Sequence, residues 1–432
     1  MAELKKSLGV ARLTFYGVGT IVGAGIYTVI GAAAGQAGYQ LWLSFILAAV
    51  AAVLAALSYA ELTSSYPNAG AEFIFLRKAF PDKDLPSFLT GWTIFFHSSA
   101  TVAAVLIAFA GYFSNFFDLP GWTLSYGLLA LLFALAILGI KKSSTINIIM
   151  VSLSLLGLVL LILFGYSEAG LPEAKMFEIP AFGKALTATG TIFFIYTGFE
   201  HMAALGSEAK KPGKTIPLAF LLTMIITTVI YLLIVFVVLQ VAKPEELNSV
   251  NSPLSLAAGN INPWLPSVLA IAAIFATANA AFSGMLSISR VMYGMASKAE
   301  LPAFLQKTNS KKAPWAATLI VGIGIGVFLL FGEIKTVAGM SSLGALLVFI
   351  AINISLIRLR YKAPEKERPF TVPLSIGKLP VLPLLSILIC AALALQFSWT
   401  VYAGFGGAIL VGVVFDYFFD KHKASEETEE KK

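Results

Sequence analysis

The chain has 432 residues, of which 58% are hydrophobic and 12% are charged, with a formal net charge of +7. Soluble domains carry about 25% charged residues, so a soluble globule of this size would have too few polar side chains to cover its core. Apolar runs of about 20 residues, each long enough to cross a bilayer, recur along the whole length. The composition therefore excludes a soluble protein and predicts an all-α, polytopic integral membrane protein.

Twelve apolar segments are expected to cross the membrane as helices. The first continues too far to be a cleaved leader, so we expect it to remain in the protein. We expect residues 1–420 to form one transmembrane domain, followed by a charged cytoplasmic tail at 421–432. The expected spans are 9–34, 41–64, 88–116, 123–140, 145–166, 182–206, 215–241, 265–297, 314–332, 337–360, 379–396 and 398–419.

The basic residues fall almost entirely on one side of these spans. With twelve crossings, 26 of the 30 Lys and Arg residues lie on one face, and the other face receives Lys175, Lys184, Lys243 and Lys335. Because basic loops remain in the cytoplasm, both termini are expected there, in a multi-pass protein of the cell membrane. The positive net charge then reflects topology, and nucleic acid is not an expected partner.

Two spans contain glycines in a pattern that the others lack. Residues 17–27 (GVGTIVGAGIY) lie in the first span and residues 190–200 (GTIFFIYTGFE) lie in the sixth. One alternative is close helix packing through small residues. The other is a discontinuous helix, because glycine tolerates non-helical backbone and the freed N–H and C=O groups attract anions and cations.

The positions of these two segments favour the discontinuous helix. They are five spans apart and cross in opposite directions, which is the arrangement of a 5+5 inverted repeat with its binding site between two broken helices. The first repeat is expected at about 9–166 and the second at about 182–360, with extra helices at about 379–419. No sequence similarity between the halves is detectable, so this prediction rests on position and direction.

Four motifs, taken in chain order, resemble the amino acid–polyamine–organocation (APC) family of permeases. Residues 17–27 resemble that family's first helix, and YAELTSSYPNAG at 59–70 resembles the end of its second. FFIYTGFE at 193–200 and SEAKKP at 207–212 resemble its sixth helix and the following loop, and SRVMYGMA at 289–296 resembles the end of its eighth. The resemblance implies a LeuT-like fold with ten core helices, helices 1 and 6 discontinuous, and two extra helices.

The resemblance also implies a site for a substrate with an α-amino and an α-carboxylate group. Backbone N–H groups of Ala24 and Gly25 would bind the carboxylate, and carbonyls of Ile21, Phe194 and Thr197 would bind the ammonium. Phe194 would be an aromatic gate, and Ala24 replaces a serine of some members, which removes one hydroxyl contact. The expected substrate-binding residues are Ile21, Gly23, Ala24, Gly25, Phe194, Tyr196, Thr197 and Gly198.

Ionisable residues within or beside the spans are further candidates, because such groups are costly in a membrane and often functional. His97 lies where cationic-amino-acid-transporter relatives look to have a glutamate; it either couples protons to transport or stays neutral between helices. Glu200 resembles the family's gate glutamate and either gates the cytoplasmic pathway, with Arg290 as its partner, or forms a structural ion pair. Glu61 and Glu72 are interpreted as loop anchors.

The coupling ion is left open by the fifth span. Proton-coupled relatives can carry a lysine there, whereas an ungapped comparison places Ser154 at that position, and residues 145–166 contain no Lys or Arg. One alternative is a Na⁺ site, and the other is hydrogen bonding of the same polar groups between helices. The candidate Na⁺ ligands and coupling groups are the carbonyls near Ile21 and Ala24, the Ser154 hydroxyl, Thr277 and Asn279.

The leading hypothesis is a secondary active transporter for an amino acid, coupled to H⁺ or Na⁺ or working as an exchanger. A neutral amino acid is favoured because few free acidic residues face the expected pocket. The alternatives are a polyamine or organic-cation carrier, a transporter-like amino acid sensor, a channel and a membrane enzyme. There is no Walker loop, no His/Cys metal cluster and no cluster of catalytic groups in the sequence, so neither an enzyme nor a cofactor is expected.

Overall fold

The computed structural model describes residues 8–22, 24–67, 71–81, 84–138, 144–170, 174–177, 182–298, 300–311 and 313–429. Most of these residues are helical, as expected for apolar segments that must make their backbone hydrogen bonds internally. The helices are α1 (Val10–Ile21), α2 (Gly25–Ala37), η1 (Gly38–Gln40), α3 (Leu41–Ser65), α4 (Ala71–Ala79), α5 (Asp84–Phe113), α6 (Gly121–Ile137), α7 (Ser144–Ala169), η2 (Ala174–Phe177), α8 (Phe182–Tyr196), η3 (Phe199–Glu208), α9 (Pro212–Val241), α10 (Pro244–Asn248), α11 (Pro253–Gly259), α12 (Leu265–Ser297), η4 (Ala303–Gln306), α13 (Trp315–Leu329), α14 (Ile334–Lys362), α15 (Val381–Ala394) and α16 (Trp399–Glu429). A short hairpin pairs β1 (Ser375–Ile376) antiparallel with β2 (Leu379–Pro380).

Each expected span contains a helix or a pair of helices. The first and sixth contain the pairs α1 with α2 and α8 with η3, and each of the others contains one helix. By length and hydropathy alone, seven helical segments of the described chain are able to cross a membrane, and α6, α13 and α15 are shorter apolar helices. The count falls below twelve because α2 is continuous with α3 by this criterion, while α1 and α8 are too short on their own.

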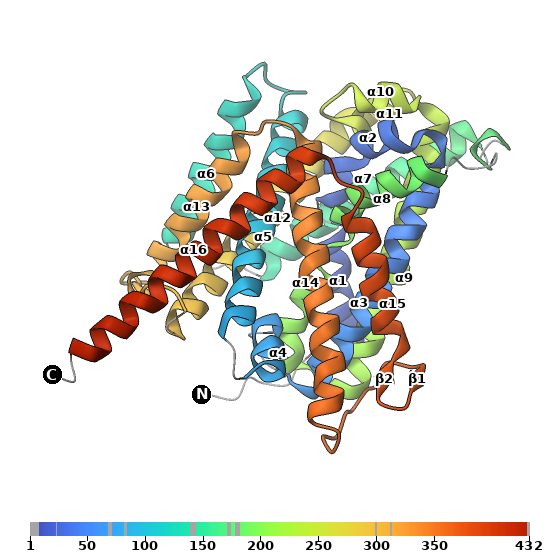
Figure 1. Cartoon of the computed structure of the whole chain (residues 1–432). Coiled ribbons are helices and arrows are strands. Elements are labelled where there is room, and N and C mark those ends of the chain that lie inside the picture. The colour runs from blue at the N-terminus through green and yellow to red at the C-terminus, as the bar shows by residue number, and fades with distance from the viewer. Residues whose placement is uncertain are drawn as a thin grey trace.

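The two ends of the helical bundle carry different short elements and different charges. Figure 1 shows α4 and the hairpin β1–β2 at one end of the bundle and α10 and α11 at the other. The last turn of α4 contains Arg77 and Lys78, whereas the first turn of α10 contains Glu245 and Glu246. Basic residues of α4 and acidic residues of α10 therefore lie at opposite ends of the bundle.

The pairs α1–α2 and α8–η3 lie inside the bundle and contact each other. α2 packs against α8 and α1 packs against η3, while α3 and α9 flank both pairs on one side. On another side, α5 packs against both α12 and α14. Gly25 permits the approach of α2 to α8, because a Cβ atom at this residue would lie 2.9 Å from the Cα atom of Ile195. Both glycine-containing spans are therefore central elements of the fold.

A buried ion network fixes the α4 end of the bundle. The Glu61 carboxylate of α3 is fully buried; it accepts hydrogen bonds from the Nε and Nη2 atoms of Arg360 in α14, the former at 2.9 Å. It also accepts one from the backbone N–H of Val372 at 2.7 Å, and Arg368 Nη1 lies 3.6 Å away. Arg368 also donates to the carbonyl of Leu359 at 3.0 Å. Glu61 thereby joins α3 to α14 and to the loop before β1, which makes it an anchor of this loop.

We expect Glu61→Gln to lower the free energy of unfolding by about 3–5 kcal/mol, because it leaves two buried guanidinium groups without their counter-charge. Denaturant titration of the purified protein in detergent measures this loss. The matched control is Glu333→Gln, an exposed carboxylate at the start of α14 that bonds only Thr336 among the contacts described, for which a change within about 0.5 kcal/mol is expected. Equal effects of the two substitutions would contradict the structural importance of the network.

Candidate functional site

The first helix is interrupted between Ile21 and Gly25. α1 ends at Ile21, and the N–H of Val22 makes the last bond of that helix, to the carbonyl of Val18 at 2.8 Å. Ala24 has non-helical dihedral angles (φ −128°, ψ −26°) and is the N-cap of α2. Gly23, which the sequence analysis includes in the substrate-binding set, lies outside the described residues. The interruption leaves the N-terminal N–H groups of α2 without helical carbonyl partners, as the proposed carboxylate site requires.

The second interruption lies at Thr197 and Gly198, between α8 and η3. Gly198 has φ +113°, and a Cβ atom there would lie 3.2 Å from the carbonyl oxygen of Thr20. Glycine is thus favoured by conformation and by space. Thr197 donates from its backbone N–H at 3.3 Å and from its hydroxyl at 2.7 Å to the carbonyl of Phe194. The Gly198 N–H donates to Glu200 Oε2 at 2.8 Å, so local side chains satisfy part of the exposed backbone.

A tyrosine on α9 joins the two interrupted helices. The hydroxyl of Tyr231 donates to the carbonyl of Ile21 at 2.9 Å and lies 3.4 Å from the carbonyl of Ile195. Tyr231 is fully buried, so water does not replace these bonds. Tyr231 is not among the site residues expected from the sequence, although a lone phenolic hydroxyl within the apolar run 215–241 is a signal that it needs an internal partner.

The aromatic residues of the sixth span lie on different sides of the break. The ring of Tyr196 packs against Tyr231 of α9 at 5.5 Å and against Phe45 of α3 at 6.4 Å. Phe199, just after the break, packs against Phe349 of α14 at 5.1 Å. Phe194 is buried, with its carbonyl engaged by Thr197. The structure therefore places Tyr196 toward α3 and α9, and it keeps Phe194 directly beside the break.

Several of the oxygen atoms considered as Na⁺ ligands carry hydrogen bonds. The carbonyl of Ala24 accepts the hydroxyl of Thr28 at 2.8 Å and the N–H of the same residue at 3.1 Å. Thr277, fully buried in α12, donates to the carbonyl of Ala273 at 2.6 Å. The carbonyl of Ser154 in α7 accepts the hydroxyl of Tyr27 at 2.9 Å, which brings this position of α7 against α2.

The remaining two polar candidates lie on α12 and α5. Asn279 is buried on α12, two residues after Thr277, and its carbonyl accepts the hydroxyl of Ser283. His97 is buried on α5, where its Nδ1 atom has no hydrogen bond. Gly344 of α14 packs directly on the Cβ atom of His97, and the imidazole of His201 in η3 is an ionisable neighbour. His97 is thus placed directly against α14.

Within the described residues, the Glu200 carboxylate binds the backbone of the break. Among the ion pairs of the described ranges, none joins Glu200 to Arg290, which is exposed on α12. The carboxylate instead accepts the Gly198 N–H. This bond needs no ordering of a long exposed side chain such as Arg290, because the Gly198 N–H is only two residues away. A hydrogen bond from a backbone N–H to a carboxylate is also strengthened by the negative charge.

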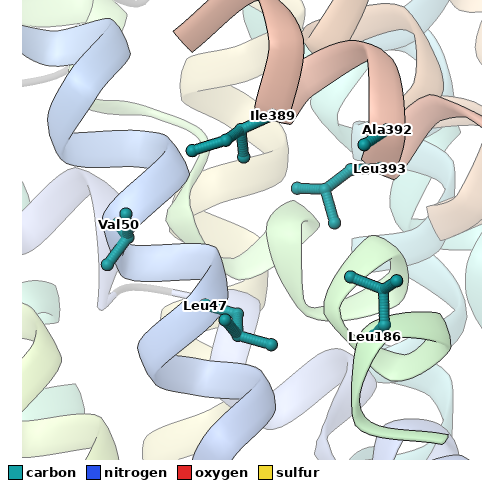
Figure 2. A pocket seen from close by; sticks show the side chains of 6 residues that line it. All are labelled: Leu47, Val50, Leu186, Ile389, Ala392 and Leu393. Carbon is teal, nitrogen blue, oxygen red and sulfur yellow. The ribbon is translucent and has the colours of Figure 1, made fainter. Parts of the chain in front are cut away.

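A separate groove on the outside of the bundle does not suit a zwitterion. Figure 2 shows the six aliphatic side chains that line this groove. The volume of the groove is about 170 Å³. These side chains come from α3, α8 and α15, and none carries a hydrogen-bonding group; they are Leu47, Val50, Leu186, Ile389, Ala392 and Leu393. An amino acid needs polar partners for both charged ends, so this groove is not a candidate for the substrate site.

Apolar helices around two adjacent broken helices define a polytopic membrane protein of the transporter class. The amino acid permease family matches residues 8–415, and the chain belongs to this family. The resemblance to APC permeases is therefore confirmed. The branched-chain amino acid permease BcaP of Bacillus subtilis (strain 168) is 29% identical over 97% of this chain and 94% of its own length.

Other relatives widen the range of solutes within the family. The methylthioribose transporter of Bacillus subtilis (strain 168) is 27% identical over 97% of this chain and 94% of its own length. The vacuolar cationic amino acid transporter 4 of Arabidopsis thaliana is 28% identical over 84% of this chain and 64% of its own length. The family consists of transporters rather than enzymes, and the chain is a multi-pass membrane protein.

We expect Tyr231→Phe to weaken amino acid binding as well as stability. Removing one hydroxyl leaves the carbonyl of Ile21 without its buried donor, at a cost of about 1–3 kcal/mol in the free energy of unfolding. The control is Tyr126→Phe, which removes the bond to the carbonyl of Gly326 (2.8 Å) between α6 and α13. Thermal unfolding with and without each of the twenty amino acids measures both effects.

Both variants are expected to unfold at a lower temperature, because both lose a hydrogen bond. Only Tyr231→Phe is expected to reduce the additional stabilisation that a bound amino acid gives. An undiminished ligand effect in Tyr231→Phe would show that this residue does not hold the site together.

Proposed function

We propose that the protein is a secondary active transporter that moves an amino acid across the cell membrane by alternating access. The observation that carries this proposal is the adjacent pair of broken helices, held together by Tyr231. Half-helix N-termini attract a carboxylate and exposed carbonyls attract an ammonium, so the pair is complementary to a zwitterion. The proposed substrate contacts are the N–H groups of Ala24 and Gly25 and the carbonyls near the two breaks.

The proposal includes twelve spans arranged as a 5+5 inverted repeat, with α15 and α16 as the extra helices. The repeat pairs α1–α2 with α8–η3, α3 with α9, α5 with α12, α6 with α13 and α7 with α14. Helix packing supports this pairing, because equivalent contacts occur twice: α3 packs against α8 as α9 packs against α1, and α5 packs against α14 as α12 packs against α7. Short helices also follow equivalent spans, α4 after α3 and α10–α11 after α9.

The orientation follows from the charged ends of the bundle. We place α4, the hairpin β1–β2 and both termini in the cytoplasm and α10–α11 outside the cell. The α4 end carries Arg358 and Lys366, which lie over the rings of Phe80 and Tyr66 at 4.5 and 4.4 Å. Cationic side chains with aromatic neighbours are common at the cytoplasmic interface, which supports this assignment.

A neutral, apolar amino acid is the proposed substrate class. Glu200 is the acidic residue beside the second break, and its carboxylate already accepts the Gly198 N–H. A cationic side chain of the substrate would therefore compete with a backbone hydrogen bond for this charge. The branched-chain specificity in the name of the Bacillus subtilis relative agrees with this reasoning, and leucine, isoleucine and valine are the first substrates to test.

We expect purified protein in proteoliposomes to take up or exchange radiolabelled leucine, isoleucine or valine. Gly25→Ala is expected to abolish uptake, because its Cβ atom would lie 2.9 Å from the backbone of α8 and widen the site. Gly294→Ala is the matched control, since a Cβ atom at that helical position of α12 meets no atom within 4 Å. The proposal fails if none of the twenty amino acids binds, accumulates or exchanges.

The coupling mode has three alternatives: H⁺ symport, Na⁺ symport and exchange. We expect His97→Asn to change the pH dependence of uptake, because His97 is buried against α14 and next to His201 of the moving half-helix. Uptake is measured with a proton gradient, with a Na⁺ gradient, and with amino acid inside the vesicles but no ion gradient. An unchanged pH profile in His97→Asn would exclude this residue from coupling, and a requirement for Na⁺ would direct attention to Ser154, Thr277 and Asn279.

A further inference from the structure

Two lysines from different segments lie over one aromatic ring near the end of α4. Lys78 is in the last turn of α4 and Lys366 is in the loop after α14, and their Nζ atoms lie 5.2 and 4.4 Å from the ring centroid of Tyr66. These distances place the two ammonium groups within about 10 Å of each other, which is the Debye length in 0.1 M salt, so the two charges repel each other. Both lysines are exposed, and a bound anion would relieve this repulsion.

A third cation, Arg358 of α14, is held in a fixed orientation at the same end of α4. Its Nε atom donates to the carbonyl of Ala79 at 2.7 Å, and its guanidinium lies 4.5 Å from the ring centroid of Phe80. Ala79 directly follows Lys78, so the arginine and the first lysine belong to one small region of the surface. Among the hydrogen bonds of the described residues, none engages the Nη atoms of Arg358. An oriented guanidinium with both Nη groups available matches two oxygens of a phosphate group.

These three cations are not neutralised by a carboxylate within the ion pairs of the described residues. The carboxylates of those pairs belong to Glu61 and Glu300, which bind other arginines. Glu365 and Glu367 flank Lys366 in the sequence and are exposed, and neither forms an ion pair in this part of the chain. The region therefore has an excess of positive charge, to which an anion from outside the protein is complementary.

The exposed face of α14 changes in character at Arg358. Ile354, Arg358 and Tyr361 are spaced by four and three residues, so they lie on one face of this membrane-spanning helix. Ile354 is 42% exposed and Tyr361 is 53% exposed. An exposed isoleucine suits the hydrocarbon of a bilayer, whereas an arginine followed by a tyrosine is typical of the headgroup region. Arg358 therefore lies at the depth of the lipid phosphates.

We propose that Arg358, Lys78 and Lys366 form a binding site for the phosphate group of an anionic phospholipid. The guanidinium of Arg358 binds the phosphate oxygens, and the two lysines add positive charge around them. A phosphate ion in solution offers the same oxygens, but only a lipid also has acyl chains to cover the apolar face of α14 at Ile354. Placement of the site in the cytoplasmic leaflet rests on the proposed orientation, whereas lipid binding itself does not depend on the proposed transport function.

Native mass spectrometry of the purified protein in an uncharged detergent tests this site directly. We expect phosphatidylglycerol to bind more tightly than phosphatidylcholine with the same acyl chains. Each of Arg358→Gln, Lys78→Gln and Lys366→Gln is expected to lower the affinity for phosphatidylglycerol about fivefold, because basic clusters at the membrane surface attract anionic lipids. The matched control is Lys335→Gln, an exposed lysine in the first turn of α14 at the other end of the helix, which keeps the wild-type affinity. Equal affinity for the two lipids, or an equal loss in the control, would overturn the proposal.

Two further variants separate phosphate binding from general charge and from folding. Arg358→Lys keeps the charge but removes the planar fork, so it is expected to bind phosphatidylglycerol more weakly than the wild type does. Wild-type affinity in this variant would overturn the assignment of Arg358 as the phosphate ligand. The double variant Lys78→Gln with Lys366→Gln leaves the bond from Arg358 to Ala79 in place, and its loss of affinity is expected without a change in the unfolding temperature measured without lipid.

Thermal unfolding distinguishes a lipid from a phosphate ion, because a ligand that binds only the folded protein raises the unfolding temperature. Phosphatidylglycerol is expected to raise this temperature in the wild type and to raise it less in the double lysine variant, whereas inorganic phosphate at the same concentration is expected to leave it unchanged. Equal stabilisation by inorganic phosphate would overturn the lipid assignment. Lipid binding without amino acid transport would refute the proposed function alone, and transport without a preference for phosphatidylglycerol would refute the lipid site alone.

Discussion

A helix that is broken inside a membrane needs partners for the backbone groups that the break exposes, because lipid offers none. In this protein the partners are few and specific. The Tyr231 hydroxyl bonds the last carbonyl of α1, and the Glu200 carboxylate bonds the N–H of Gly198. Thr197 and Thr28 bond carbonyls one turn before them. A carboxylate would satisfy N–H groups that a break exposes at the N-terminus of the following helix, here α2. The need for backbone partners therefore links the fold to the proposed site.

The same low-dielectric constraint governs the charged side chains at the α4 end of the bundle. Glu61 compensates Arg360 and Arg368 in a fully buried network that connects α3, α14 and the loop before β1. A compensated buried charge fixes an arrangement, because losing either partner leaves the other unpaired in a low-dielectric site. This end of the molecule therefore contains a permanent connection between α3, α14 and the loop before β1.

The sequence was sufficient for the features that depend on local pattern. Apolar run length located the helices, and the glycines at 17–27 and 190–200 located both interruptions, because left-handed backbone and close approach require glycine at Gly198 and Gly25. It did not locate Tyr231, since the residues around a tyrosine in an apolar run do not indicate which distant carbonyl its hydroxyl bonds. It also did not reveal the bond between the Gly198 N–H and Glu200, because a search for opposite charges does not detect a backbone N–H two residues away.

The sequence also does not determine on which side of the break the ring of Tyr196 lies. Its position directly before the break makes it an expected substrate contact, and only the packing of its ring on Phe45 and Tyr231 places it toward α3 and α9. There it stiffens the side of the break that Tyr231 holds. On the α14 side, Phe199 and Phe349 pack against Tyr59 and against each other. The break is therefore fixed by the Tyr231 hydrogen bonds and by aromatic packing on the α9 side, and by a second aromatic cluster on the α14 side.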